Sequence, residues 1–301
     1  MKFLFVFCFL VVFMVPAFGQ SENFVLPKEL IIVLPKDGAA QAEWVAPPLA
    51  EAQVRKAGFS GQKFRLDWQK AVWMAYNQKV LTNLASGVTF SLARKLNDFI
   101  WLDDGALFIV SENSIGFIPP LKKGQIVEKG VPEVPYQPIF DLPAQRCSLA
   151  SDGKDTIFVY GYDQAAQAYA VFELLKGFAG WQKVFVSSEK IGAVCVDGKA
   201  LYIAAGRIVY KMQMGKKEAS VVFAHPLDLI TGIAYAPGAG LFYATYNGIG
   251  VVNGPGIEFI KCKGAQIEIK DKILYIFMPE SLGVMRLRNI EQLFGQKKNK
   301  E

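Results

Sequence analysis

The fold is decided by Ile230-Thr231-Gly232-Ile233-Ala234-Tyr235-Ala236, which the turn Pro237-Gly238 separates from a second apolar stretch, Leu241 to Thr245. Two further short stretches follow, Ile249 to Val252 and Ile257 to Lys261, and Asn247-Gly248 precedes the first of them. All are rich in β-branched and aromatic residues, and Asn-Gly favours a two-residue hairpin because both positions accept positive φ. The segment therefore predicts four consecutive antiparallel strands joined by tight turns.

The same unit recurs along the chain. Its first turn is found at Asp104-Gly105, Asp152-Gly153, Asp197-Gly198, Pro237-Gly238 and Lys270-Asp271, and an apolar second strand follows each turn. A weaker sixth copy precedes them, with strands expected within Lys63 to Ala93. The spacing fits the period of roughly 40 residues that is typical of propeller blades. The repeat predicts an all-β fold, a six-bladed β-propeller of four-stranded antiparallel blades at residues 59–290.

Across nearly the whole mature sequence the chain resembles the six-bladed β-propeller proteins. The resemblance is one of repeat pattern, since there is no YWTD signature and no tryptophan–aspartate dipeptide ending the third strands. It implies a fold and not an activity.

The N-terminus has the pattern of a signal peptide. Lys2 precedes an apolar run from Phe3 to Val15, and Ala17-Phe18-Gly19 supplies small residues for cleavage. We expect residues 1–19 to be removed and the protein to be exported, to the periplasm or outside the cell. The mature chain keeps Cys147, Cys195 and Cys262, which we expect to be buried free thiols.

The last copy of the repeat lacks a fourth strand. Residues 20–58 hold an apolar strand without a blade, Glu29 to Leu34, which we expect to complete the last blade because an open sheet edge invites aggregation. In the alternative, Asn289 to Phe294 completes that blade and the N-terminal strand is a free arm. Residues 291–301 form a basic C-terminal tail.

Polar loops are expected to gather on one face of the propeller, where the blade-joining loops and the turns between second and third strands lie. The candidate ligand- or partner-binding residues on this face are Asn77, Arg94, Lys95, Glu112, Asn113, Asp163, His225, Asp228, Asn247, Lys261 and Lys263. Their carboxylate and amide oxygens suit calcium. Hairpin turns alone also explain most of the Asn, Asp and Gly residues, and no cofactor is assigned.

Catalytic motifs are lacking in the sequence. His225 is the only histidine, so a Ser-His-Asp mechanism would depend on it, and a role in a turn is the alternative. There is no HExxH, CxxC pair, phosphate-binding glycine loop or dinucleotide fingerprint, which argues against zinc and nucleotide chemistry. The formal charge of +6 comes from dispersed basic residues, which argues against nucleic-acid binding.

Two functions follow as hypotheses. The first is an exported non-catalytic β-propeller, a binding or scaffolding module for another protein or an envelope component, without a membrane span. The alternative is a metal-dependent lactonase-like hydrolase that uses Asp98, Glu112, Asp163 or Asn247. Gluconolactonase-like propellers bind a divalent ion with carboxylate and amide groups in the central channel, and the polar residues expected on the inner strands are Arg65, Asp67, Asp98, Arg146 and Glu268.

Overall fold

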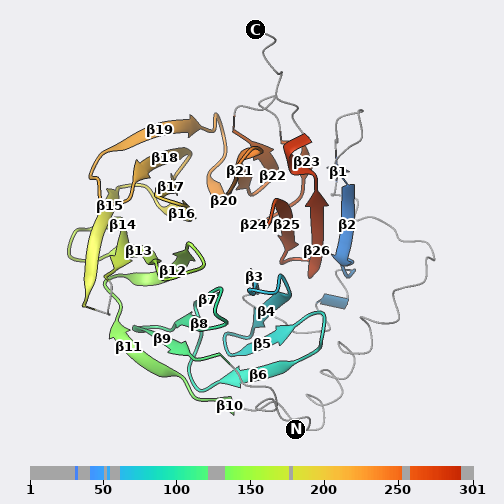
Figure 1. Cartoon of the computed structure of the whole chain (residues 1–301). Coiled ribbons are helices and arrows are strands. Elements are labelled where there is room, and N and C mark those ends of the chain that lie inside the picture. The colour runs from blue at the N-terminus through green and yellow to red at the C-terminus, as the bar shows by residue number, and fades with distance from the viewer. Residues whose placement is uncertain are drawn as a thin grey trace. The chain divides into compact units, whose positions relative to one another are not determined.

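The computed structural model describes residues 31–32, 41–50, 53–54, 62–120, 133–175, 179–252 and 258–292. Its strands form six sheets of four or five strands, in which successive strands of a blade pair in antiparallel order (Figure 1). The all-β fold and the six-bladed propeller predicted from the repeat are confirmed. The predicted signal peptide, residues 1–19, lies outside the described residues. Within the described residues, no helix has the length and apolar character needed to cross a membrane.

The chain divides into two compact units, with the boundary at Ile191. The first unit holds the first three blades. Their strands are β3 (Lys63–Leu66), β4 (Val72–Tyr76), β5 (Val80–Asn83), β6 (Thr89–Leu92), β7 (Asp98–Trp101), β8 (Leu107–Val110), β9 (Ser114–Ile118), β10 (Glu133–Val134), β11 (Gln137–Asp141), β12 (Gln145–Ser151), β13 (Ile157–Asp163), β14 (Ala168–Leu174) and β15 (Trp181–Ser187).

The second unit holds the last three blades. Their strands are β1 (Ile31–Ile32), β2 (Gln41–Ala46), β16 (Ile191–Asp197), β17 (Ala200–Ala205), β18 (Ile208–Gln213), β19 (Ala219–Ala224), β20 (Ile230–Ala236), β21 (Gly240–Thr245), β22 (Gly248–Val251), β23 (Ile260–Lys261), β24 (Gln266–Lys270), β25 (Ile273–Met278) and β26 (Gly283–Arg288). A 3-10 helix, η2 (Ile290–Gln292), follows β26.

The last blade is completed by an N-terminal strand, but not by the one expected. β2 pairs with β26, from Gln41 opposite Arg288 to Ala46 opposite Val284. The expected strand lay at residues 29–34, of which the described part, β1, pairs instead with β23 of the preceding blade. Trp44 favours the pairing of β2 with the last blade, because its side chain packs against the hydrophobic core shared by the last two blades. The 3-10 helix at η2 also rules out the alternative in which residues 289–294 form the fourth strand.

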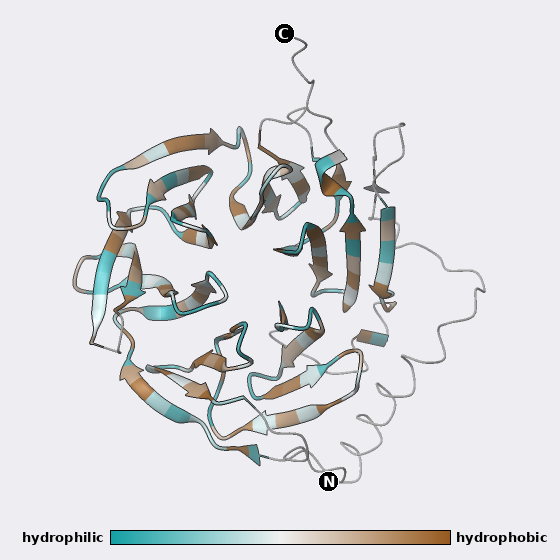
Figure 2. Cartoon of the chain, in the orientation of Figure 1, coloured by the Kyte–Doolittle hydropathy of each residue, from teal (hydrophilic) through white to brown (hydrophobic). Residues whose placement is uncertain are grey.

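The cores of the blades lie in their second strands. β8, β21 and β25 are almost completely buried, because their side chains belong to hydrophobic clusters shared with adjacent blades of the same unit. Figure 2 shows apolar residues in the strands, whereas many of the connecting turns are hydrophilic.

Candidate functional site

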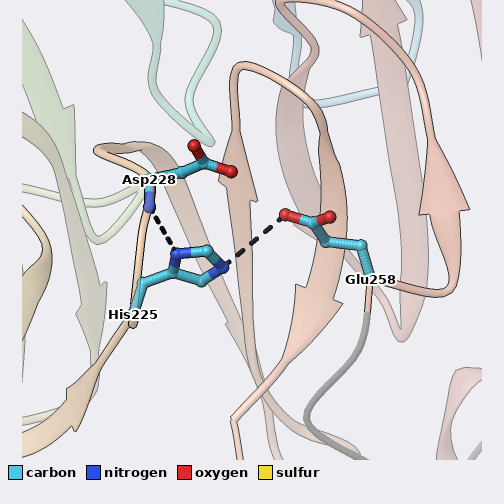
Figure 3. A group of neighbouring side chains, drawn as sticks. All are labelled: His225, Asp228 and Glu258. Atoms are coloured by element: carbon cyan, nitrogen blue, oxygen red, sulfur yellow. Dashed lines mark hydrogen bonds and ion pairs between the residues drawn. The ribbon is translucent and has the colours of Figure 1, made fainter.

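Three side chains able to ligate a cation meet in the second unit: His225, Asp228 and Glu258 (Figure 3). One donor atom from each lies within 4.8 Å of the others. His225 and Asp228 belong to the loop between β19 and β20, which joins two blades, while Glu258 lies just before β23. We call these three residues the carboxylate–histidine cluster.

The imidazole of His225 shapes the loop that carries it. Its Nδ1 accepts hydrogen bonds from the backbone N–H groups of Leu227, at 3.3 Å, and Asp228, at 2.8 Å. An atom that accepts two N–H donors carries no proton, so neutral His225 is protonated at Nε2. That N–H faces Glu258 Oε1 at 3.7 Å.

Glu258 is held by the turn between β21 and β22. Its Oε1 accepts a hydrogen bond from the Thr245 hydroxyl at 2.9 Å. Gly248 makes this approach possible, because a Cβ there would lie 2.4 Å from the carbonyl oxygen of Ile260 and 3.1 Å from the Glu258 Cβ. Any larger residue at position 248 would push the Glu258 segment away from the cluster.

Asp228 is oriented by the same turn. Asn247 Nδ2 donates a hydrogen bond to Asp228 Oδ2 at 3.1 Å. The Thr245 hydroxyl in turn accepts from the backbone N–H groups of Asn247 and Gly248. The prediction of positive φ at Asn247 and Gly248 is wrong, because neither residue has a positive φ. The hydrogen bonds to the Thr245 side chain close this turn instead.

Two aromatic rings pack against the His225 side chain. The His225 ring contacts Phe223 and Tyr243, with centroids 6.3 Å and 5.6 Å away, and these two rings stack at 4.8 Å. Gly250 leaves room for the Tyr243 ring, which a Cβ would approach to 2.3 Å. Burial, together with the charge of Glu258, raises the pKa of Tyr243 and keeps its hydroxyl neutral.

Of the predicted site residues, the structure brings His225, Asp228 and Asn247 together. Lys261 and Lys263 lie on and just after β23, exposed, three and five positions beyond Glu258. Glu258 was missed because it falls inside the strand expected at Ile257 to Lys261 and has no turn signal of its own. Its closeness to residues about 30 positions earlier comes from the fold, and no spacing in the sequence shows it.

The remaining predicted site residues lie in the first unit and form no common site there. Asn77 has positive φ in the turn between β4 and β5, and Arg94 lies over the Tyr136 ring. Lys95 pairs with Glu112 at 3.8 Å on the surface, next to the exposed Asn113. Asp163 accepts hydrogen bonds from the backbone of its turn and pairs with Lys183 at 2.5 Å, in a structural role.

Asp98, a residue of the lactonase hypothesis, is inaccessible. Its side chain is 0% exposed and accepts hydrogen bonds from Arg65, at 2.8 Å, and from the Leu149 N–H, at 3.0 Å. Burial alone would raise the pKa of Asp98, but Arg65, Lys63 and the Leu149 N–H outweigh it and lower the pKa. The pair joins the first strands of three consecutive blades, so its role is structural.

Cys147, Cys195 and Cys262 are free thiols, as expected, although Cys195 is only partly buried. Burial raises the pKa of Cys147, Cys195 and Cys262 to about 12 in each case. Because the thiolate is the reactive form, none is poised as a nucleophile.

No protein-family model and no curated protein matches the chain. Among solved structures it is similar to a luciferin-regenerating enzyme, with a TM-score of 0.60 and 11% identity over 83% of this chain and 95% of that one. A gluconolactonase from Xanthomonas campestris gives a TM-score of 0.55 and 10% identity over 90% and 98%. A calcium-binding protein, regucalcin, from Agrobacterium tumefaciens gives 0.53 and 12% over 76% and 93%.

These comparisons correct the choice between the two hypotheses. The expectation of a non-catalytic binding or scaffolding module was wrong, because the propellers that match include a luciferin-regenerating enzyme and a gluconolactonase. At 10 to 12% identity the likeness itself shows the fold and transfers no residue role.

Proposed function

We propose that the protein is a metal-dependent hydrolase of the lactonase type whose reaction centre is the carboxylate–histidine cluster. The observation that carries the proposal is the meeting of two carboxylates, Asp228 and Glu258, from separate loops around a single histidine. Two like charges this close favour a cation between them. The other carboxylates of the lactonase hypothesis, Asp98, Glu112 and Asp163, belong to the first unit, whereas this cluster belongs to the second.

The donor set fits a hard divalent cation such as calcium. Two metal–oxygen bonds of about 2.3–2.6 Å span up to about 5 Å between ligand atoms, which suits the separation of at most 4.8 Å in the cluster. His225 does not fit as a ligand, because Nδ1 is occupied by backbone donors and Nε2 bears the proton. Its part is to orient Glu258, as residues behind metal ligands commonly do.

A cation held by Asp228 and Glu258 would polarise a lactone carbonyl and make an attacking water more acidic. The chain supplies the proton transfers. The Glu258 oxygen that does not bind the cation would take a proton from the attacking water and return it to the ring oxygen that departs. His225 Nε2–H, which faces Glu258 Oε1 at 3.7 Å, would hold this carboxylate in place during the transfer.

Hydrolysis of simple γ- and δ-lactones in the presence of calcium or manganese tests the proposal. Asp228→Asn and Glu258→Gln are each expected to lower kcat/KM by about 100-fold or more, as loss of a metal ligand or proton acceptor does. Glu112→Gln, an exposed surface carboxylate, is the matched control and should retain full activity. Equal activity in all three variants would refute the assignment of this site.

Export is part of the same proposal. The charged Lys2, the apolar run to Val15 and the small residues at Ala17 and Gly19 support removal of residues 1–19 and a periplasmic or secreted location. The substrate would then be a molecule met outside the cytoplasm.

A further inference from the structure

Exposed apolar side chains occur in the loop that carries His225 and Asp228 and in the turn between β21 and β22, whose Asn247 is hydrogen-bonded to Asp228. Among the described residues, six large hydrophobic side chains are exposed, and three of them belong to this loop and this turn: Leu227, Leu229 and Tyr246. Leu227 is 81% exposed, the most of all six. Single exposed hydrophobic residues are ordinary, but their concentration at one place marks a binding surface.

The loop conformation separates the polar and apolar side chains. Asp228 is directed to the cluster, because its backbone N–H bonds to His225 and its carboxylate accepts from Asn247. Leu227 and Leu229 flank it on either side and are exposed to solvent. Tyr246 precedes Asn247 in the facing turn and is 51% exposed. Three exposed apolar side chains therefore belong to the loop that carries Asp228 and to the turn that is hydrogen-bonded to it.

We propose that the substrate is a lactone with an alkyl chain, whose chain covers Leu227, Leu229 and Tyr246 while its ester group reaches Asp228 and Glu258. The inference rests on the proposed function and adds the class of substrate to it. A polyhydroxylated sugar lactone would instead need polar partners along its length, and the leucines offer none. Covering apolar surface contributes about 25 cal/mol per Å², which an alkyl chain can supply and a sugar cannot.

Chain-length dependence tests the inference. The probes are γ-lactones whose alkyl substituent grows from no carbon to eight carbons, compared with glucono-δ-lactone. We expect kcat/KM to rise about two- to fourfold per added methylene, the range that partial to full burial of a CH₂ group gives. The Leu227→Ser/Leu229→Ser double variant should flatten this rise, so that the largest loss of kcat/KM is on the longest alkyl chain.

Val186→Ser is the matched control, because Val186 is 50% exposed on β15 of the first unit. It should leave the chain-length dependence unchanged. Equal rates across the series, or a preference for glucono-δ-lactone, would overturn the inference and leave the proposed function standing. Hydrolysis of none of the lactones would overturn the proposed function and the inference with it. Leu227, Leu229 and Val186 are exposed, so the variants should have the same melting temperature as the parent protein, which a thermal scan verifies.

Discussion

Two charged groups, one in each unit, show how differently the same residue types can be used. Asp98 in the first unit is fully buried and faces Arg65, a cation, with the Leu149 N–H completing its hydrogen bonds. Asp228 and Glu258 in the second unit are partly exposed, and the His225 Nε2 atom lies 3.7 Å from Glu258 Oε1. A compensated, buried carboxylate stabilises the fold, whereas two neighbouring carboxylates at the surface are suited to bind a cation.

The largest effect is expected at the buried pair. Asp98→Ala removes the partner of Arg65 and leaves the Leu149 N–H unsatisfied, so the free energy of unfolding should fall by about 3–5 kcal/mol. Glu112→Ala, which removes a surface ion pair at 3.8 Å, should cost less than about 1 kcal/mol. Chemical denaturation measures both, and a similar cost for the two variants would remove the contrast between buried and exposed pairs.

A smaller effect is expected from calcium, which should stabilise the protein through the second unit and not through the first. At a calcium concentration 100 times the dissociation constant, binding should raise the free energy of unfolding by about 2.7 kcal/mol. Asp228→Asn should abolish this gain, whereas Asp163→Asn in the first unit should keep it, although Asp163 is also a carboxylate beside a turn, at the end of β13. A melting temperature that calcium and EDTA leave unmoved would contradict the cation site.

The smallest effect is expected in the dependence of the free energy of unfolding on pH. The pKa of Asp98 is lowered in the folded protein, so its contribution is fully present above its unfolded pKa of about 3.9 and is lost as the pH falls through the folded value. The slope is at most about 1.4 kcal/mol per pH unit for one proton. Asp98→Asn should flatten the acid limb of the stability curve, and an unchanged limb would mean that other carboxylates govern it.

The sequence predicted the blades well because turns and apolar alternation are local properties. The expected second strand Leu241 to Thr245 lies within β21, Gly240–Thr245, and the weak first copy is a complete four-stranded blade. The strand that completes the last blade was misassigned because Gln41–Ala46 is less apolar than residues 29–34, and only Trp44 marks its buried face.

The candidate site was only partly predictable. His225, Asp228 and Asn247 were found because polar loop residues are visible in the repeat. Glu258 was not, because its position depends on Gly248 allowing close approach and on the Thr245 hydroxyl, and both are contacts made in three dimensions. The expectation of a non-catalytic module was wrong for a related reason. It depended on the lack of a known catalytic motif, and a catalytic site can be assembled in three dimensions without one.

The pairing of β2 with β26 sets the order in which the chain can finish folding. Arg286 donates two hydrogen bonds to Glu43, a residue 243 positions earlier. β2 is therefore synthesised early, but its partner β26 becomes available only when nearly all of the polypeptide has been made. Contacts this distant in sequence form slowly. A chain that stops before residue 283 keeps an open edge on β2, so truncation at the C-terminus should expose the N-terminal segment to aggregation and proteases.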